Sequence, residues 1–141
     1  MSDQPNGYNP MRWDCREDGC FNYKKRPKIE VFSACLPGKI AFGDIDATTE
    51  VGGNELSLEW KEAPKPLSVG QRLMFERLTD DGRKTVLILA GDARTMQITH
   101  AALFKQGQFK TWKPYTLEQA KEFLQRWATW AQAHPHRVMS P

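Results

Sequence analysis

The sequence lacks three features that would place it in a specialised class of protein. It has no apolar run of about 18 residues, so it offers no candidate for a membrane-spanning helix. The polar stretch MSDQPNGYNP at its start has no apolar core of the signal-peptide kind. Its net charge is only +3. We therefore expect a cytoplasmic protein with no membrane partner, and a charge that permits nucleic acid as a partner without requiring it.

Cysteine is also scarce. The chain has three cysteines, Cys15, Cys20 and Cys35, and an odd number argues against a disulfide framework. Common structural zinc sites use CxxC pairs and four ligands, whereas four residues separate Cys15 from Cys20. Free or buried thiols are thus favoured over zinc at Cys15, Cys20 and Cys35, and a small zinc-stabilised binding domain is the alternative.

The length and composition suit one ordinary domain. The chain has 141 residues, of which 40% are hydrophobic. Residues 1–23 are rich in Pro, Gly, Asn and Asp and predict an N-terminal arm, followed by a single domain over residues 24–141. The apolar segment 28–35 fits a strand or one helical turn equally well.

Alternating polar and apolar residues predict a β-hairpin over residues 39–61. In residues 55–61, ELSLEWK, the residues Leu56, Leu58 and Trp60 face one side and the polar residues face the other. The turn signal Gly52-Gly53-Asn54 lies between the two strands.

The rest of the chain predicts two capped helices with strands between them. Ser68 and Gln71 have capping-box spacing and open a helix over residues 68–79, with Met74, Phe75 and Leu78 as its apolar face. The run TVLILA, residues 85–90, predicts a strand buried on both faces.

Beyond that strand, residues 94–99 and 108–112 are expected to pair as a second hairpin around Gly107. Thr116 and Gln119 open a C-terminal helix over residues 116–134. Its apolar stripe is Ala120, Phe123, Leu124, Trp127 and Ala131. The order of elements predicts an α/β fold with a mixed central sheet.

Three polar side chains of the first hairpin favour metal chemistry. Glu59 and Lys61 share one face of a strand, and the turn brings Asp46 beside Glu59. Two carboxylates, with the backbone carbonyl of Trp60, are ligands that suit Mg²⁺ or Mn²⁺. Such an ion activates water and neutralises charge on a phosphate, and Lys61 offsets charge in the transition state.

The same residues resemble the PD-(D/E)xK nuclease superfamily, most closely its VRR-NUC branch and more loosely the Holliday-junction resolvases. The matching segments are Gly43-Asp44-Ile45-Asp46, then Glu59-Trp60-Lys61 after twelve intervening residues, then Leu67-Ser68-x-x-Gln71. The likeness covers about residues 38–91. It implies a small restriction-endonuclease-like fold and a Mg²⁺-dependent endonuclease acting on DNA. A homodimer is a further possibility, because nucleases that cut two strands often dimerise.

By position, the resemblance assigns the metal site to Asp46, Glu59 and Lys61 and the placement of water or phosphate to Gln71. The sequence departs from the family where Ile45 replaces the proline before the aspartate. Asp44 is an additional carboxylate that can substitute for Asp46 or bind a second metal. Glu30 is the candidate for the glutamate that many members bring from an N-terminal helix.

Two alternatives compete with catalysis. The basic residues Lys24, Lys25, Arg26, Lys28 and Arg72 are candidate DNA-phosphate contacts, but such a group is as often a solvated surface. The polar hairpin face can likewise be a solvated sheet face. The chain would then be a non-catalytic DNA- or protein-binding accessory module on a nuclease-like scaffold. A compact nuclease would suit a phage or mobile element.

Overall fold

The computed structural model describes residues 29–38, 40 and 45–136. The chain divides into two compact units, residues 1–43 and 44–141. The predicted N-terminal arm, residues 1–23, lies outside the described residues. In the first unit Ile29–Cys35 form a short 3-10 helix, η1, which is the helical alternative for that segment. None of the helices in the described ranges is long and apolar enough to cross a membrane.

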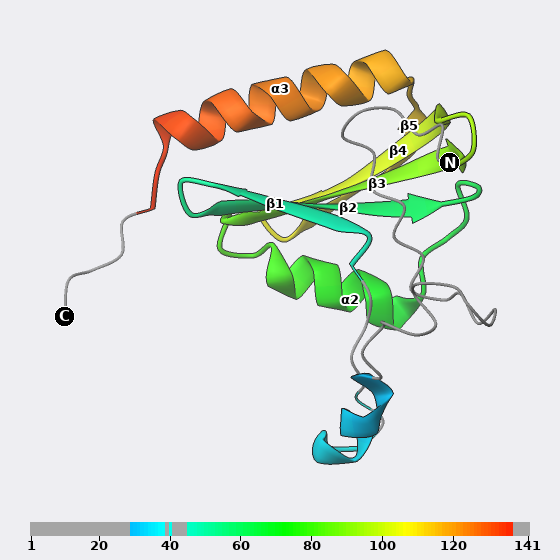
Figure 1. Ribbon diagram of the computed structural model, residues 1–141, viewed down its shortest axis with the longest axis vertical. Coiled ribbons are helices and arrows are strands. Elements are labelled where there is room, and N and C mark those ends of the chain that lie inside the picture. Colours follow the sequence, from blue (N-terminus) through cyan, green and yellow to red (C-terminus); the bar gives the residue numbers. More distant parts are fainter. Residues whose placement is uncertain (1–28, 39, 41–44, 137–141) are drawn as a thin grey trace, which may run out of the picture. The chain divides into compact units, whose positions relative to one another are not determined.

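The second unit is a mixed five-stranded sheet with a helix on each face (Figure 1). Its elements are β1 (Ala47–Val51), β2 (Asn54–Lys61), α2 (Val69–Leu78), β3 (Lys84–Asp92), β4 (Gln97–Lys105), β5 (Gln108–Pro114) and α3 (Leu117–Ala133). The strands lie in the order β1-β2-β3-β4-β5, and only β2 and β3 are parallel. The predicted mixed α/β sheet and the predicted order of elements are confirmed.

The first hairpin turns at two glycines. Gly52 and Gly53 have φ values of 60° and 87°, which glycine adopts without the steric cost that a side chain would add. In the register of β1 on β2, Ala47 lies opposite Leu58. The described residues Ile45 and Asp46 precede the strand, so the hairpin is shorter than the predicted range 39–61.

Strand β3 is the centre of the core. Its residues from Thr85 to Gly91 are all buried, as the run TVLILA predicts. On the α2 face, Phe75 packs with Val86, Ile88, Ala102 and Phe104. On the α3 face, the buried residues are Leu87, Leu89, Ile98, Ala101 and Ala120. Strand β3 therefore lies between two apolar layers.

The predicted apolar face of α2 is wrong for two of its three residues. Phe75 is buried, but Met74 and Leu78 are 46% and 48% exposed. The physical reason is the composition of the sheet under this helix, because the β2 residues on that face are polar. Of the three residues, only Phe75 packs on an aromatic ring of the sheet, with 5.2 Å between the centroids of its ring and that of Phe104.

The predicted second hairpin has the wrong first strand. Residues 93–96 form a turn, and β4 runs through Gln97–Lys105, where it pairs with both β3 and β5. The turn between β4 and β5 is at Gln106-Gly107, with φ values of 53° and 75°, so its predicted position around Gly107 is confirmed. The predicted strand, residues 94–99, ended too early because it left out the apolar residues of β4 that face the two cores.

Helix α3 has the predicted start and end. Thr116 and Gln119 form a complete capping box, and Ala120, Trp127 and Ala131 are buried. At its other end, the side-chain nitrogen of the fully buried Asn54 donates to the backbone oxygens of Ala131 and His134 at 3.3 and 3.0 Å. These bonds fix the end of α3 at the β1–β2 turn.

Gly91 should tolerate no side chain, whereas Gly70 should accept one. A Cβ at Gly91 would overlap the backbone oxygen of Gln97 and lie 2.9 Å from the Cα of Ile98. We expect Gly91→Ala to lower the free energy of unfolding by about 2 kcal/mol or more. At Gly70, in α2, nothing lies within 4 Å of the position that a Cβ would take, so Gly70→Ala should raise it by about 0.5 kcal/mol. Urea denaturation measures both, and equal midpoints for the two variants would contradict this packing.

Candidate functional site

From Glu55 onward the polar residues of β2 lie on the α2 face of the sheet, whereas the side chain of Asn54, the first residue of the strand, bonds to the end of α3. Leu56 and Leu58 pack toward α3, so the alternating residues Ser57, Glu59 and Lys61 face the other way. The predicted division of the strand into an apolar and a polar face is therefore confirmed. The polar face is not a fully solvated one, because Ser57 and Glu59 are only 2% and 8% exposed.

Glu59 is held beside the apolar core. Its cross-strand neighbour on β3 is Ile88, which is completely buried against Phe75. On the other side, the pair Ala47–Leu58 ends the described register, and Asp46 and Glu59 are the next residues along the two strands. A carboxylate with so little exposure needs polar or charged partners. Such burial is common among functional carboxylates and rare among carboxylates on solvated sheet faces.

Asp46 contacts the end of β2 directly. Its Oδ2 accepts a hydrogen bond of 2.6 Å from the backbone nitrogen of Trp60. Because β1 begins one residue later in the chain, this carboxylate oxygen replaces a strand carbonyl as the acceptor. In an extended strand the N–H and C=O of one residue point to the same neighbour, so the Trp60 carbonyl faces the same edge as Asp46.

Gln71 joins α2 to β2. Its backbone nitrogen donates to Ser68 Oγ at 3.1 Å, which is the predicted cap. Its side chain does not close a capping box: instead, Gln71 Oε1 accepts from Lys61 Nζ at 3.3 Å. The structure thus brings Lys61 and Gln71 together and places Asp46 against the residue between Glu59 and Lys61.

Other predicted site residues are not brought to this place. Asp44, Lys24, Lys25, Arg26 and Lys28 lie outside the described residues, as do Cys15 and Cys20. Glu30 lies in η1, in the other unit, and its side chain is not described. Cys35 is exposed and forms no disulfide. Over residues 29–38, 40 and 45–136 no three His, Cys, Asp or Glu side chains gather as a metal-binding group.

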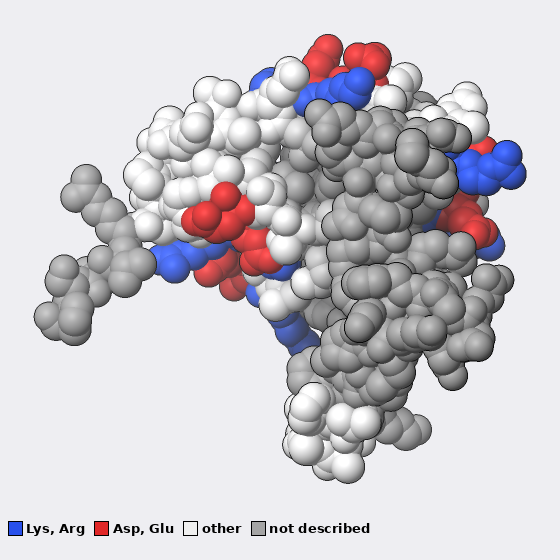
Figure 2. Space-filling model, in the orientation of Figure 1, with Lys and Arg blue, Asp and Glu red and all other residues white. Residues whose placement is uncertain are grey.

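Arg72 has partners within the chain. Its Nε lies 3.0 Å from Glu76 Oε1, and its guanidinium lies 5.1 Å from the centre of the Phe109 ring. On the face drawn in Figure 2, the described Lys and Arg side chains lie next to Asp and Glu in small groups, not in one broad basic surface. A phosphate contact from Arg72 would therefore compete with Glu76.

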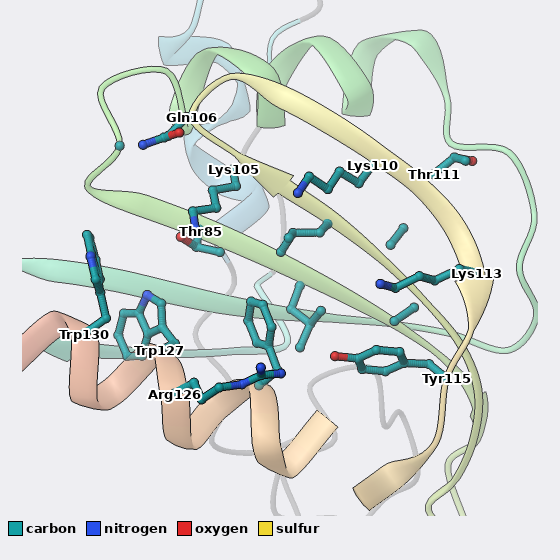
Figure 3. A pocket seen from close by; sticks show the side chains of 16 residues that line it. Thr85, Lys105, Gln106, Lys110, Thr111, Lys113, Tyr115, Arg126, Trp127 and Trp130 are labelled. Carbon is teal, nitrogen blue, oxygen red and sulfur yellow. The ribbon is translucent and has the colours of Figure 1, made fainter. Parts of the chain in front are cut away.

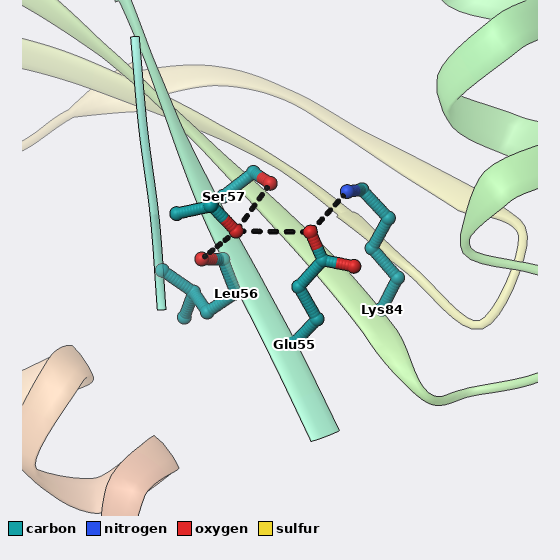
Figure 4. Close-up of polar contacts among 5 residues, drawn as sticks. Glu55, Leu56, Ser57 and Lys84 are labelled. Atoms are coloured by element: carbon teal, nitrogen blue, oxygen red, sulfur yellow. Dashed lines mark hydrogen bonds and ion pairs between the residues drawn. The ribbon is translucent and has the colours of Figure 1, made fainter. Parts of the chain in front are cut away.

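Sequence reasoning missed a second polar cluster, at the other end of β2. Glu55 Oε2 accepts from Lys84 Nζ at 2.8 Å and from Thr48 Oγ1 at 2.9 Å, and Ser57 Oγ donates to Thr48 (Figure 4). The hydrogen bond from Lys84 lowers the pKa of the Glu55 carboxyl, against desolvation, which raises it. The parallel register, which sets Glu55 beside Lys84, was the missing signal.

Removing Lys84 should raise the pKa of Glu55. A carboxyl whose pKa is lowered in the folded state contributes stability above its unfolded pKa, near the usual 4.5, and loses it as the pH falls through the folded value. We expect Lys84→Met to shift the NMR titration of Glu55 upward and to weaken the acid dependence of stability below that pH. Lys65→Met, in an exposed loop, is the control. An unchanged Glu55 titration in Lys84→Met would contradict the ion pair.

No family model matches the chain, and neither a curated protein nor a solved structure is significantly similar to it. The likeness to PD-(D/E)xK nucleases therefore stays a prediction from the residues quoted above. The functional assignment depends on the contacts of Asp46, Glu59, Lys61 and Gln71 within this structure.

Proposed function

We propose that the chain is a metal-dependent endonuclease of the PD-(D/E)xK type that hydrolyses phosphodiester bonds in DNA. One observation carries the proposal: three of the four residues assigned by the sequence motif make contacts at one end of β2, and the fourth, Glu59, is the residue next to Trp60 on that strand. Lys61 contacts Gln71, and Asp46 contacts the backbone nitrogen of Trp60, the residue between Glu59 and Lys61. Asp46 precedes β2 in the sequence and Gln71 follows it. Contacts of both residues with the same end of this strand support a functional site there.

Asp46 and Glu59, with the Trp60 carbonyl, are the residues that would hold Mg²⁺ or Mn²⁺. All three supply oxygen, which these hard cations prefer, and one or two carboxylates are the usual protein share of a magnesium site. Only one oxygen of Asp46 is used by Trp60, and the Asp46 side chain is exposed, so its second oxygen is accessible. The ion, when bound, would lower the pKa of a water molecule and neutralise phosphate charge.

Lys61 and Gln71 would orient and stabilise the substrate. The Gln71 oxygen holds the Lys61 ammonium at 3.3 Å, which leaves the amide nitrogen of Gln71 as a donor for a phosphate oxygen or for the attacking water. The ammonium offsets negative charge that develops on phosphorus-bound oxygens. The first turn of α2 contains no acidic residue, so the positive end of its dipole is not cancelled beside this pair.

Cleavage of DNA in the presence of Mg²⁺ or Mn²⁺ should depend on Glu59 and Lys61. We expect the purified chain to cut at least one of duplex, single-stranded and branched DNA, and Glu59→Gln or Lys61→Gln to lower the rate by about a hundredfold or more. Glu59→Gln keeps the size of the side chain and Lys61→Gln shortens a side chain at the end of the strand, so circular dichroism and the unfolding midpoint should stay close to wild type. A gel assay with end-labelled substrates measures the rate.

The matched controls are Glu118→Gln and Lys121→Gln. These two exposed residues pair with each other on α3, at 3.7 Å, on the opposite face of the sheet. They should retain wild-type cleavage. Failure of the wild-type chain to cut any of the three substrates with either metal would overturn the catalytic proposal. Salt-sensitive DNA binding that is indifferent to EDTA would then favour the accessory-module alternative.

A further inference from the structure

A cavity of about 560 Å³ lies on the opposite face of the sheet, between α3 and the strands β4 and β5 (Figure 3). Its floor is apolar and includes Leu87, Ala101 and Leu103. This volume is within the range of about 300–1,000 Å³ found for small-molecule sites. Because α2, Lys61 and Gln71 lie on the other face, the cavity does not belong to the site described above.

All charged residues that line the cavity are positive. Lys105, Lys110 and Lys113 come from β4 and β5, and Arg126 comes from α3. None of them forms an ion pair with another residue in the described ranges. Figure 3 shows the side chains of Lys110 and Lys113 directed toward the same space as the Tyr115 hydroxyl. Four cations around one hollow repel one another, and an anion bound among them would remove that repulsion.

The helix side of the cavity is aromatic. Phe123, Trp127 and Trp130 line it from α3, and Tyr115 lines it from the end of β5. Trp127 is only 8% exposed, and its ring nitrogen is a buried donor without a hydrogen-bond partner among the described residues. In Figure 3 this nitrogen is turned toward Thr85 and the strands that form the cavity floor. The Trp60 ring nitrogen, which does not line the cavity, is a buried donor of the same kind, so the aromatic rings of this side, not the Trp127 nitrogen, are what a ligand would contact.

We propose that this cavity binds a nucleotide, with the base against the aromatic side and the phosphate among Lys105, Lys110, Lys113 and Arg126. Aromatic rings that stack on bases, next to a positively charged groove, are the combination by which proteins hold single nucleotides and single strands. A purely apolar ligand would leave the four cations without a counter-charge. Inorganic phosphate or a duplex backbone would leave the aromatic side of the cavity unused.

The nucleotide can come from two sources, a free nucleoside phosphate or a residue of single-stranded DNA. Neither needs a metal, and neither uses Glu59 or Lys61. This inference is therefore independent of the proposed nuclease activity, and binding is measured in EDTA, where hydrolysis cannot contribute.

The experiment compares ligands on the full-length chain. A fluorescein-labelled oligothymidylate is titrated by anisotropy, and dTMP, thymidine and inorganic phosphate are added as competitors. We expect dTMP to compete better than thymidine or phosphate alone if a single nucleotide fills the site. Binding of the oligothymidylate without competition by dTMP would identify a strand as the source. Absence of binding by both the oligothymidylate and dTMP would overturn the proposal.

Variants locate the binding in the cavity. The double variant Lys110→Gln, Lys113→Gln should weaken oligothymidylate binding about tenfold and lower the slope of log affinity against log salt by about 0.7 for each phosphate that the protein no longer neutralises. Trp130→Ala, at an exposed position, should weaken binding about tenfold because a base can no longer stack there. The charge-matched control is Lys65→Gln, Lys121→Gln, which changes two exposed lysines outside the cavity.

Two further results decide the matter. Glu118→Gln, at an exposed position of α3 that does not line the cavity, should bind as wild type does. If the cavity double variant weakens binding no more than its control does, while circular dichroism shows that both are folded, the cavity is not the nucleotide site and the proposal fails.

Discussion

The parallel pairing of β2 with β3 is the constraint from which both ends of the candidate site follow. Two parallel neighbours cannot be joined by a tight turn, so the chain must cross from the end of β2 to the start of β3, and α2 makes that crossing. The helix therefore begins where β2 has just ended. This is why Gln71, in the first turn of α2, lies within hydrogen-bond distance of Lys61, the last residue of β2.

Burial of β3 holds this pairing in place. Every residue of the strand from Thr85 to Gly91 is buried, and the two faces pack on different helices. A shift of β2 by one residue along β3 would exchange its faces, so that Glu59 would enter the apolar layer under α3 and Leu58 the polar one. The register that satisfies the core is thus the one that brings the polar residues to the α2 face.

The two faces of the sheet have different chemistry for the same reason. On the α2 face the odd-numbered residues of β2 are polar, which limits the apolar contact of α2 to Phe75 and leaves Met74 and Leu78 exposed. On the α3 face the same strand contributes Leu56 and Leu58 to the core. Elsewhere on that face, α3 does not pack directly on the sheet. There, aromatic residues of the helix face lysines of β4 and β5 across the cavity.

Much of this could be predicted from local sequence. The alternation in ELSLEWK, the run TVLILA and the caps at Ser68 and Thr116 are determined by neighbours in the chain, so they identified β2, β3, α2 and α3. The two-residue period also placed Glu59 and Lys61 on one face.

What could not be predicted depends on pairing between distant segments. The Glu55–Lys84 ion pair follows from the β2–β3 register, the true length of β4 from its two partners, and the cavity from where α3 crosses β4 and β5. Asp46 illustrates the boundary between the two cases. Its position beside Glu59 follows from the hairpin, but its bond to the Trp60 backbone follows only from where β1 begins.

The proposed endonuclease requires Asp46 and Glu59 to hold a divalent cation at the end of β2. The most direct test is paramagnetic broadening of the backbone amide signals of the isotope-labelled chain by substoichiometric Mn²⁺. If the cation binds there, broadening should be strongest at Asp46, Glu59–Lys61 and Gln71, excess Mg²⁺ should reverse it, and Glu59→Gln should weaken it. Broadening confined to other acidic residues, or none at the end of β2, would show that Asp46 and Glu59 do not hold the cation.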